Sequence, residues 1–210
     1  MAGPFRGWPE EAQRFFIGLE LDNTKRYFEA NRKTYEEAVR GPMVALFESL
    51  EKDYGPGKVF RANRDIRFSK DKSPYKTNIA GHTGFEGTGG YISFDARGLT
   101  VAAGRYELTP AQLTKYRKKV AAEATGAPLA AIVARLERAG YKLGAEALKR
   151  VPAGFPQDHP RGRLLRHKNL YVYKDFGLQP WLGSPAARKH VVKVLTDAEP
   201  LSDWLQRNVG

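Results

Sequence analysis

The sequence contains no cysteine among its 210 residues. This absence excludes disulfide bonds, zinc sites built on thiolates and catalysis by a cysteine nucleophile. It is also typical of a reducing compartment, so we expect a cytoplasmic protein. Long apolar runs are missing too, and no stretch approaches the roughly 18 apolar residues that predict a transmembrane helix. The first residues lack the basic and apolar regions of a secretory signal, and we expect no membrane association.

Acidic residues are scarce as well. Asp and Glu number 23 against 35 Lys and Arg, which leaves a formal net charge of +12. A positive charge of this size favours association with phosphates, nucleic acid or anionic membranes, at least without specificity. The charge alone does not distinguish a specific anion site from a surface that is merely basic. The remaining composition, 41% hydrophobic and 28% charged, is that of an ordinary globular protein.

Helical periodicity dominates the first quarter of the chain. Apolar residues recur there at helical spacing, and they predict three helices over residues 9–22, 24–40 and 43–54. The Gly41–Pro42 pair is expected to separate the second helix from the third. Residues 55–57, Gly-Pro-Gly, are a firm stop for the third.

A strand is predicted next, because the hydrophobic period changes to two. Apolar residues alternate with polar ones from Val59 to Phe68. Arg64 falls among the apolar positions, so either a bulge re-aims its side chain or it is buried and paired. A turn over residues 69–74 and a strand over residues 77–79 should follow, and then a glycine-rich loop over residues 81–90 that contains His82. Residues 91–94 and 99–102 predict an antiparallel hairpin.

Mixed elements fill the second half of the chain. Helices are predicted from residues 110, 128 and 185, with a strand over residues 170–173. Helices, then strands, then mixed elements predict the α+β class, with a mainly antiparallel sheet packed against several helices. We expect a single domain over residues 1–210.

The most basic stretch of the sequence is residues 60–76, FRANRDIRFSKDKSPYK, with six Lys or Arg and two Asp. Guanidinium groups match phosphate and carboxylate oxygens in two-point contacts, so this stretch predicts binding of an anionic small molecule. On a strand, Arg61 and Arg67 would lie roughly 20 Å apart, too far for one phosphate. A single anion is therefore expected at Arg67 with Lys70, Lys72 or Lys76 from the turn. The candidate ligand-binding residues are Arg67, Lys72, Lys76, Arg61, Arg64, Asp65 and Tyr75.

An alternative interpretation makes the same stretch structural. Asp65 would then be the counter-ion of Arg61, Arg64 or Arg67, and the protein's function would be a protein contact. Asp65 is a poor general base in either case, because neighbouring guanidinium groups lower a carboxyl pKa. The sequence shows no metal-binding motif and no nucleophile elbow, so we expect no metal site. It does not identify a cofactor, a catalytic residue or an oligomeric state, and these are left open. His82 and His159 are expected to be surface or supporting residues. Whether a reaction follows binding is left open.

A nucleic acid is the second candidate partner. Basic clusters at residues 61–76, 117–119 and 161–168 could form a continuous positive stripe, and interleaved Tyr and Phe could stack with bases. Against this interpretation, no RNP, helix-turn-helix or zinc-finger pattern is present. Most of the aromatic residues are also explained by core periodicity.

The basic stretch follows a longer pattern, R-x-x-R-D-x-R-F-x-x-D-K-x-x-Y-K. Its positions are filled here by Arg61, Arg64, Asp65, Arg67, Phe68, Asp71, Lys72, Tyr75 and Lys76. This pattern resembles a family of uncharacterised bacterial proteins, domain of unknown function 2461.

Two other segments extend the resemblance over nearly the whole chain. In the first, Asp22 and Tyr27 replace the family's usual Asn and Trp. The residues that match it are Asn23, Phe28, Arg32 and Tyr35. In the second, weaker segment the residues that match are Gly154, Phe155, Asp158, His159, Pro160 and Lys168. The family has no established activity, so the resemblance implies none.

Overall fold

The computed structural model describes residues 3–67, 70–84 and 89–210. Phe68, an apolar position of the predicted strand and of the family pattern, lies outside the described residues. Contacts divide the chain into two compact units. Unit 1 holds Met1–Gly84, Tyr91–Val101 and Asp175–Lys193; unit 2 holds Phe85–Gly90, Ala102–Lys174 and Val194–Gly210. The single-domain organisation stays a prediction.

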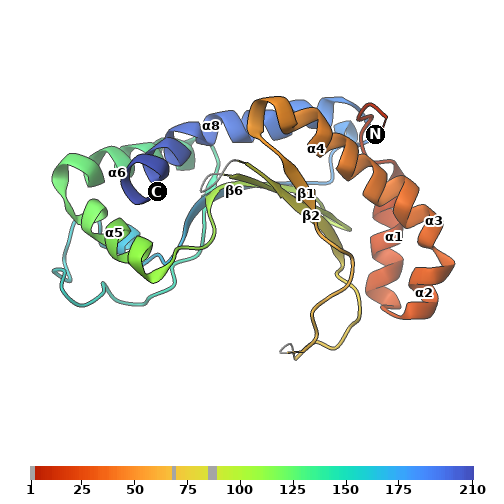
Figure 1. Cartoon of the computed structure of the whole chain (residues 1–210), viewed down its shortest axis with the longest axis horizontal. Coiled ribbons are helices and arrows are strands. Elements are labelled where there is room, and N and C mark those ends of the chain that lie inside the picture. The colour runs from red at the N-terminus through yellow and green to blue at the C-terminus, as the bar shows by residue number, and fades with distance from the viewer. Residues whose placement is uncertain (1–2, 68–69, 85–88) are drawn as a thin grey trace. The chain divides into compact units, whose positions relative to one another are not determined.

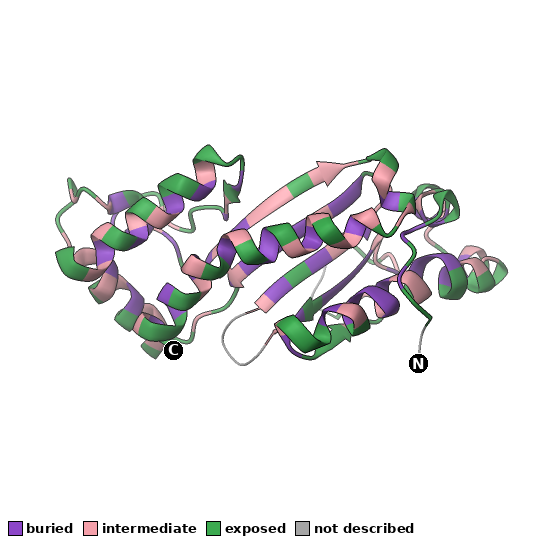
Figure 2. Ribbon diagram, turned by 90° about the horizontal axis from the view of Figure 1, so that it is seen from above, coloured by how far each residue is buried: buried purple, intermediate pink, exposed green. Residues whose placement is uncertain are grey.

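The described strands form one six-stranded sheet in the order β1-β2-β3-β4-β6-β5 (Figure 1). Their bounds are Gly57–Val59 (β1), Asn78–Thr83 (β2), Gly89–Asp95 (β3), Gly98–Arg105 (β4), Lys142–Leu143 (β5) and Leu170–Gly177 (β6). Together with the helices this confirms the α+β class and the antiparallel sheet. Buried residues alternate with less buried ones along β3, as the coloured bands of the strands in Figure 2 illustrate. This alternation places one face of the sheet toward the core.

Unit 1 begins with helices α1 (Glu10–Leu21), α2 (Lys25–Ala30) and α3 (Arg32–Thr34). Phe15 of α1, Phe28 of α2 and Tyr35, which follows α3, form a buried aromatic cluster; the Phe28 ring centroid lies 5.8 Å from that of Phe15 and 4.9 Å from that of Tyr35. Thr24 caps α2 by accepting a hydrogen bond from the backbone N–H of Tyr27.

The predicted helix break at Gly41–Pro42 is wrong. A π-helical turn, η1 (Tyr35–Arg40), leads directly into α4 (Gly41–Tyr54). Proline has no N–H, and inside an α-helix its ring collides with the carbonyl of the fourth residue before it. The wider π turn, in which the N–H of Gly41 bonds the carbonyl of Glu36, relieves that collision. The helix therefore continues through the proline.

Helix α4 covers one face of β1 and β2. A Cβ atom added to Gly57 or Gly81 would lie within 2.7 Å of the Phe47 ring, so the two glycines let this helix approach closely. Gly81 lies opposite Val59 in the β1–β2 register, and His82 lies opposite Lys58. Because side chains alternate along a strand, His82 and Lys58 lie on the face away from α4.

The predicted strand from Val59 to Phe68 is also wrong. Regular pairing ends at Val59, and residues 60–67 and 70–77, which we call the arm, continue from β1 and β2 as an irregular extension (Figure 1). Val59 lies opposite Gly81, and Asn63 lies opposite Tyr75. The chain therefore advances four residues from Val59 to Asn63 but six residues from Tyr75 to Gly81 on its return. The two extra residues break the ladder, which explains why alternation in the sequence did not produce a strand.

Unit 2 contains helices α5 (Pro110–Ala121), α6 (Glu123–Arg138) and α7 (Gly162–Leu165). Thr109 and Gln112 form a capping box at the start of α5. Tyr116 is fully buried, and its hydroxyl donates to the carbonyl of Leu164 at 2.8 Å. These contacts hold α5 against α7.

The end of the chain forms a short 3₁₀ turn, η2 (Pro180–Gly183), and the long helix α8 (Ala186–Val209). In unit 1, the Arg188 guanidinium of this helix donates to the Ser49 carbonyl of α4 at 2.9 Å. In unit 2, the Trp204 indole of the same helix donates to the Thr125 carbonyl of α6 at 2.9 Å. No helix within the described residues is both long enough and apolar enough to cross a membrane.

Candidate functional site

The arm is anchored to the helices of unit 1 at Tyr75. The side-chain amide of Asn23 bonds the Tyr75 backbone twice, donating to its carbonyl at 3.0 Å and accepting from its N–H at 3.1 Å. The Tyr75 ring is stacked on Phe28, with centroids 4.1 Å apart and planes 6° apart. At 6% exposure Tyr75 is a core side chain, although it was a candidate ligand-binding residue.

Two ion pairs use both aspartates of the arm. Arg64 pairs with Asp71, and its guanidinium also reaches the Tyr75 carbonyl at 3.4 Å. Asp65 pairs with Arg67 in a two-point contact at 3.0 and 2.7 Å. Of the three arginines considered as the counter-ion of Asp65, Arg67 is its partner in the structure, whereas Arg64 pairs with Asp71.

The exposure of these pairs determines how far they support the fold. The Arg64 side chain is only 26% exposed, as its place among the apolar positions predicted, whereas that of Arg67 is 75% exposed. Hydrogen bonds from Arg67 lower the pKa of Asp65, so this carboxylate is a poor base, as predicted. The Asp65–Arg67 pair is too exposed to contribute much to stability.

The lysines of the arm bind backbone carbonyls. Lys72 donates to the carbonyl of Ile66 at 2.9 Å, and Lys76 donates to that of Arg61 at 3.1 Å. Burial and the nearby guanidinium groups of Arg61 and Arg64 lower the pKa of Lys76. Each ammonium has three donors and uses one of them here, so both lysines can still bind an anion.

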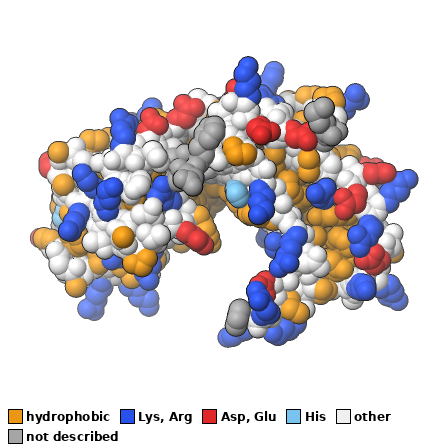
Figure 3. All heavy atoms as spheres, viewed as in Figure 1, with side chains coloured by type: hydrophobic (Ala, Val, Ile, Leu, Met, Phe, Trp, Pro, Cys, Tyr) orange, Lys and Arg blue, Asp and Glu red, His pale blue; other side chains and the backbone are white. Residues whose placement is uncertain are grey.

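The arm therefore brings together Arg61, Arg64 and Lys76, which we call the cation cluster. Arg67 and Lys72 belong to the turn at the tip, and neither is among the charges that shift the Lys76 pKa. Arg61, Lys70, Lys72 and Lys76 form no ion pair with a carboxylate anywhere in residues 3–67, 70–84 and 89–210. Figure 3 shows basic side chains gathered on the arm.

The face of β1–β2–β3 away from α4 carries aromatic side chains that the sequence analysis did not single out. The Phe60 ring centroid lies 5.5 Å from that of His82 and 6.5 Å from that of Tyr91. His82 is exposed and Tyr91 is 38% exposed. His82 lies in β2 and not in the predicted glycine-rich loop. The density of glycines around it hid the strand alternation that could have revealed this face.

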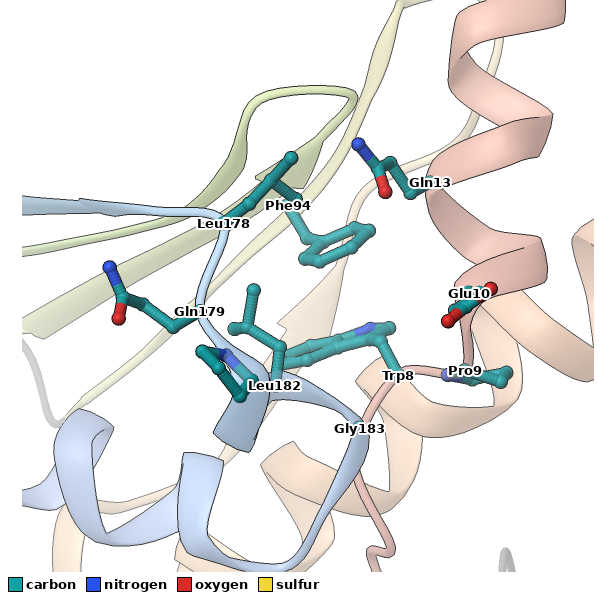
Figure 4. A pocket seen from close by; sticks show the side chains of 10 residues that line it. Trp8, Pro9, Glu10, Gln13, Phe94, Leu178, Gln179, Leu182 and Gly183 are labelled. Atoms are coloured by element: carbon teal, nitrogen blue, oxygen red, sulfur yellow. The ribbon is translucent and has the colours of Figure 1, made fainter.

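A separate hollow of about 440 Å³ lies elsewhere in unit 1 (Figure 4). Its walls include Trp8, Phe94 and Leu182, and its polar side chains are Glu10, Gln13 and Gln179. The Trp8 ring is stacked on Phe94 at 5.0 Å and is 2% exposed, so the floor of the hollow belongs to the core. No Lys or Arg lines it, so this hollow is not the predicted basic pocket.

The described residues contain no group of three or more His, Asp or Glu that could hold a metal ion.

In the last basic cluster, residues 161–168, the arginines have acidic partners. Arg161 pairs with Glu123 at 2.8 Å, and Arg163 pairs with Glu137 at 2.6 Å. Arg166 pairs with Glu146. These pairs remove most of the positive charge that a continuous stripe through residues 161–168 would need.

Because His167 is buried, we expect the free energy of unfolding to depend measurably on pH. His167 is 1% exposed, neither ring nitrogen makes a hydrogen bond of good geometry within the described chain, and burial lowers its pKa despite the opposing charge of Glu146. Below about pH 6.5, the usual histidine pKa, the unfolded chain takes up a proton that folded His167 resists. The free energy of unfolding should therefore fall as pH drops below that value.

Urea titrations at pH 7.5 and pH 5.0 would measure this effect. We expect H167L to lose a smaller part of its unfolding free energy between these pH values than the native chain does. The matched control is H82Q, which removes an exposed histidine and should leave the pH dependence as it was. An H167L protein with the native pH dependence would show that His167 does not contribute.

Comparison with known proteins places this arrangement in a family. Residues 11–204 match the family model described as a conserved hypothetical protein, DUF2461. The chain belongs to the DUF2461 family. No curated protein and no solved structure matched the chain. Membership confirms the resemblance seen in the sequence and assigns no activity.

In this DUF2461 protein, the first matched segment positions the arm. Asn23 and Phe28 hold Tyr75, as described above, and the Arg32 guanidinium lies 5.9 Å from the centre of the Phe28 ring. Arg32 also forms a two-point ion pair with Glu29, at 2.8 and 2.6 Å. These matched residues therefore have structural partners, and none of them needs a ligand to explain its position.

The weaker matched segment of this DUF2461 protein caps helix α5. The backbone N–H of Arg161 donates to Nδ1 of His159 at 3.0 Å. Nε2 of His159 faces the Ala121 carbonyl at 3.4 Å. Arg161 itself donates to the carbonyls of Val120 and Ala121 at 2.7 and 2.8 Å. His159 is thus a supporting residue, and no pattern in the sequence indicated the cap that Arg161 forms.

Proposed function

We propose that this protein binds a phosphate-bearing ligand at the cation cluster of the arm, Arg61, Arg64 and Lys76. The observation that supports this proposal is the position of Lys76. Its ammonium donates to the Arg61 carbonyl at 3.1 Å, and burial together with the charges of Arg61 and Arg64 lowers its pKa. Like charges held together destabilise the free protein, and a bound anion would remove that repulsion.

The cation cluster replaces the arrangement that the sequence favoured. Arg67, Lys72 and Lys76 were expected to surround the anion, whereas the charges that act on Lys76 are those of Arg61 and Arg64 and not those of Arg67 or Lys72. Arg61 forms no ion pair with a carboxylate among the described residues. Each hydrogen bond from a charged group contributes roughly 1.5–3 kcal/mol. Two or three of them support millimolar to micromolar affinity once entropy losses are included.

Tripolyphosphate is a suitable probe, because it carries closely spaced phosphates and no other recognisable group. At a concentration ten times its Kd we expect stabilisation of about 1.4 kcal/mol, which raises the melting temperature of a chain of this size by about 4 °C. The R61A/K76A double variant should lose this shift, because both head groups leave the cluster. Thermal unfolding followed by circular dichroism at matched ionic strength measures it.

The matched control is K33A/K52A, which removes the same charge from exposed positions on α3 and α4. It should keep the tripolyphosphate shift. Equal shifts in the native protein and R61A/K76A would contradict the proposal. A shift lost equally in both double variants would show that only net charge matters.

A further inference from the structure

We propose that the ligand is a single-stranded nucleic acid that lies on the face of β1–β2–β3 away from α4. Its bases would stack on Phe60, His82 and Tyr91, and its phosphates would contact Lys58, Arg61 and Lys76. We call these six residues the stacking face. This inference rests on the proposed function and narrows the phosphate-bearing ligand to a polymer that also carries planar rings.

The three rings form a connected group on one side of the sheet. The Phe60 ring lies at 5.5 and 6.5 Å from those of His82 and Tyr91, at angles of 49° and 37° to them. The core aromatics of the same unit are different, because Phe28 and Tyr75 are 4% and 6% exposed whereas Tyr91 is 38% exposed. Core packing therefore accounts for Phe28 and Tyr75 and leaves the exposed edge of Tyr91 unexplained.

Positive charge flanks these rings at close range. The Lys76 ammonium lies 5.5 Å from the centre of the Phe60 ring, and Lys58 is the register partner of His82. Arg61 follows Phe60 directly and belongs to the cation cluster. None of these three cations has a carboxylate partner in the described part of the chain. A ligand with alternating rings and phosphates matches this alternation of aromatic and cationic groups.

The shape of the stacking face favours a polymer over a small molecule. Small-molecule sites are concave and bury most of their ligand. The stacking face combines an exposed strand surface with the adjoining part of the arm, and the hollow beside Trp8 shares no residue with it. A single strand presents its bases for stacking, whereas a duplex hides them, and stacking on aromatic side chains tolerates any base.

Fluorescence anisotropy with a labelled 12-nucleotide oligothymidine tests the stacking contact. We expect Y91L to weaken binding about tenfold, because stacking contributes strongly per base and leucine has no π face. Y91F should bind like the native protein. The control is Y106L, which changes another exposed tyrosine, at 70% exposure, in unit 2. It should leave the affinity unchanged, and circular dichroism would verify that each variant is folded.

Salt dependence tests the phosphate contacts. Three contacted phosphates predict a slope of log K against log salt of about −2 for a single strand. K58A should make that slope shallower by about 0.7. K52A, on the helix that covers the opposite face, should leave the slope unchanged. If K58A and K52A changed the slope equally, the placement of the nucleic acid on this face would be wrong.

The outcomes separate this inference from the proposed function. If tripolyphosphate binds at the cation cluster and oligothymidine does not, the stacking inference fails and the anion site stands. If oligothymidine binds and Y91L leaves its affinity unchanged, stacking on this face is likewise excluded. If neither probe binds, both proposals fail. Binding of oligothymidine that Y91L weakens and Y91F retains supports the inference.

Discussion

Replacing Tyr75 with alanine should lower the free energy of unfolding by about 3–5 kcal/mol, the usual result for a buried aromatic side chain. The Tyr75 ring is 6% exposed and stacked on Phe28 at 4.1 Å. Its removal opens a cavity in the aromatic cluster of unit 1 and also loosens the arm from α2. Urea-induced unfolding measures the loss of stability.

Hydrogen exchange distinguishes the two consequences of Y75A. The N–H groups of Arg64 and Lys76 bond the carbonyls of Pro74 and Ala62, so they should exchange faster when the arm loosens. Y75F retains the stacked ring and should remain near native stability. Y91A removes an exposed ring and should cost less than about 1 kcal/mol. A Y75A protein as stable as Y91A would show that the arm is not anchored through this stack.

Replacing Arg161 with methionine should lower the free energy of unfolding by about 3 kcal/mol, because hydrogen bonds from charged groups contribute roughly 1.5–3 kcal/mol each. Its side chain is 10% exposed and bonds two carbonyls at the end of α5 as well as Glu123. A cation is favoured there because the last carbonyls of a helix lack partners and carry its negative end. Gly126 makes the approach possible, since a Cβ at that position would lie 2.6 Å from Arg161 Nε.

The matched comparison is R163M. Arg163 also binds a glutamate in two-point geometry, but its side chain is 50% exposed. Exposed ion pairs contribute at most about 1 kcal/mol, so R163M should stay close to native stability in the same urea titration. Similar losses for R161M and R163M would mean that the helix cap contributes little beyond an ordinary surface ion pair.

The fold class could be predicted because most helices and strands formed where the local hydrophobic spacing and turn residues indicated them. Ala12, Phe15, Phe16 and Leu19 have helical spacing, and all four are buried on α1. The hairpin of β3 and β4 formed where the turn residues predicted it. The rule that Gly-Pro ends a helix failed at Gly41–Pro42, where a π turn accommodates the proline within a continuous helical segment. A proline normally indicates a break, and nothing in the local sequence distinguishes this exception.

The arm shows why the candidate site was only partly predictable. Alternation from Val59 to Phe68 indicated a strand, but strand formation needs a partner in register, and the returning chain has two extra residues. Of the two alternatives for Arg64, the structure shows a partly buried and paired side chain. Its partner could not be predicted, because Asp71 is seven residues further along the chain and the arm that carries both is held by the Asn23–Tyr75 contact, 52 residues apart in sequence.

Charge counting from the sequence overstated the basic surface. Residues 161–168 looked as basic as the arm, yet each of their three arginines has a glutamate partner from elsewhere in unit 2. The arm has two aspartates for six basic residues, and both aspartates are used. The arm therefore keeps an excess of positive charge that a ligand could neutralise. Only the three-dimensional pairing distinguishes these two clusters.

Chemical-shift mapping with tripolyphosphate tests the central claim most directly. In ¹H–¹⁵N spectra of the native protein, the account predicts that the largest shifts fall on the amides of Arg61, Arg64 and Lys76 and on their neighbours in the arm. The shifts should saturate with one affinity and disappear in the R61A/K76A variant. Shifts spread evenly over the basic residues of both units, or centred on the hollow beside Trp8, would contradict a phosphate site on the arm.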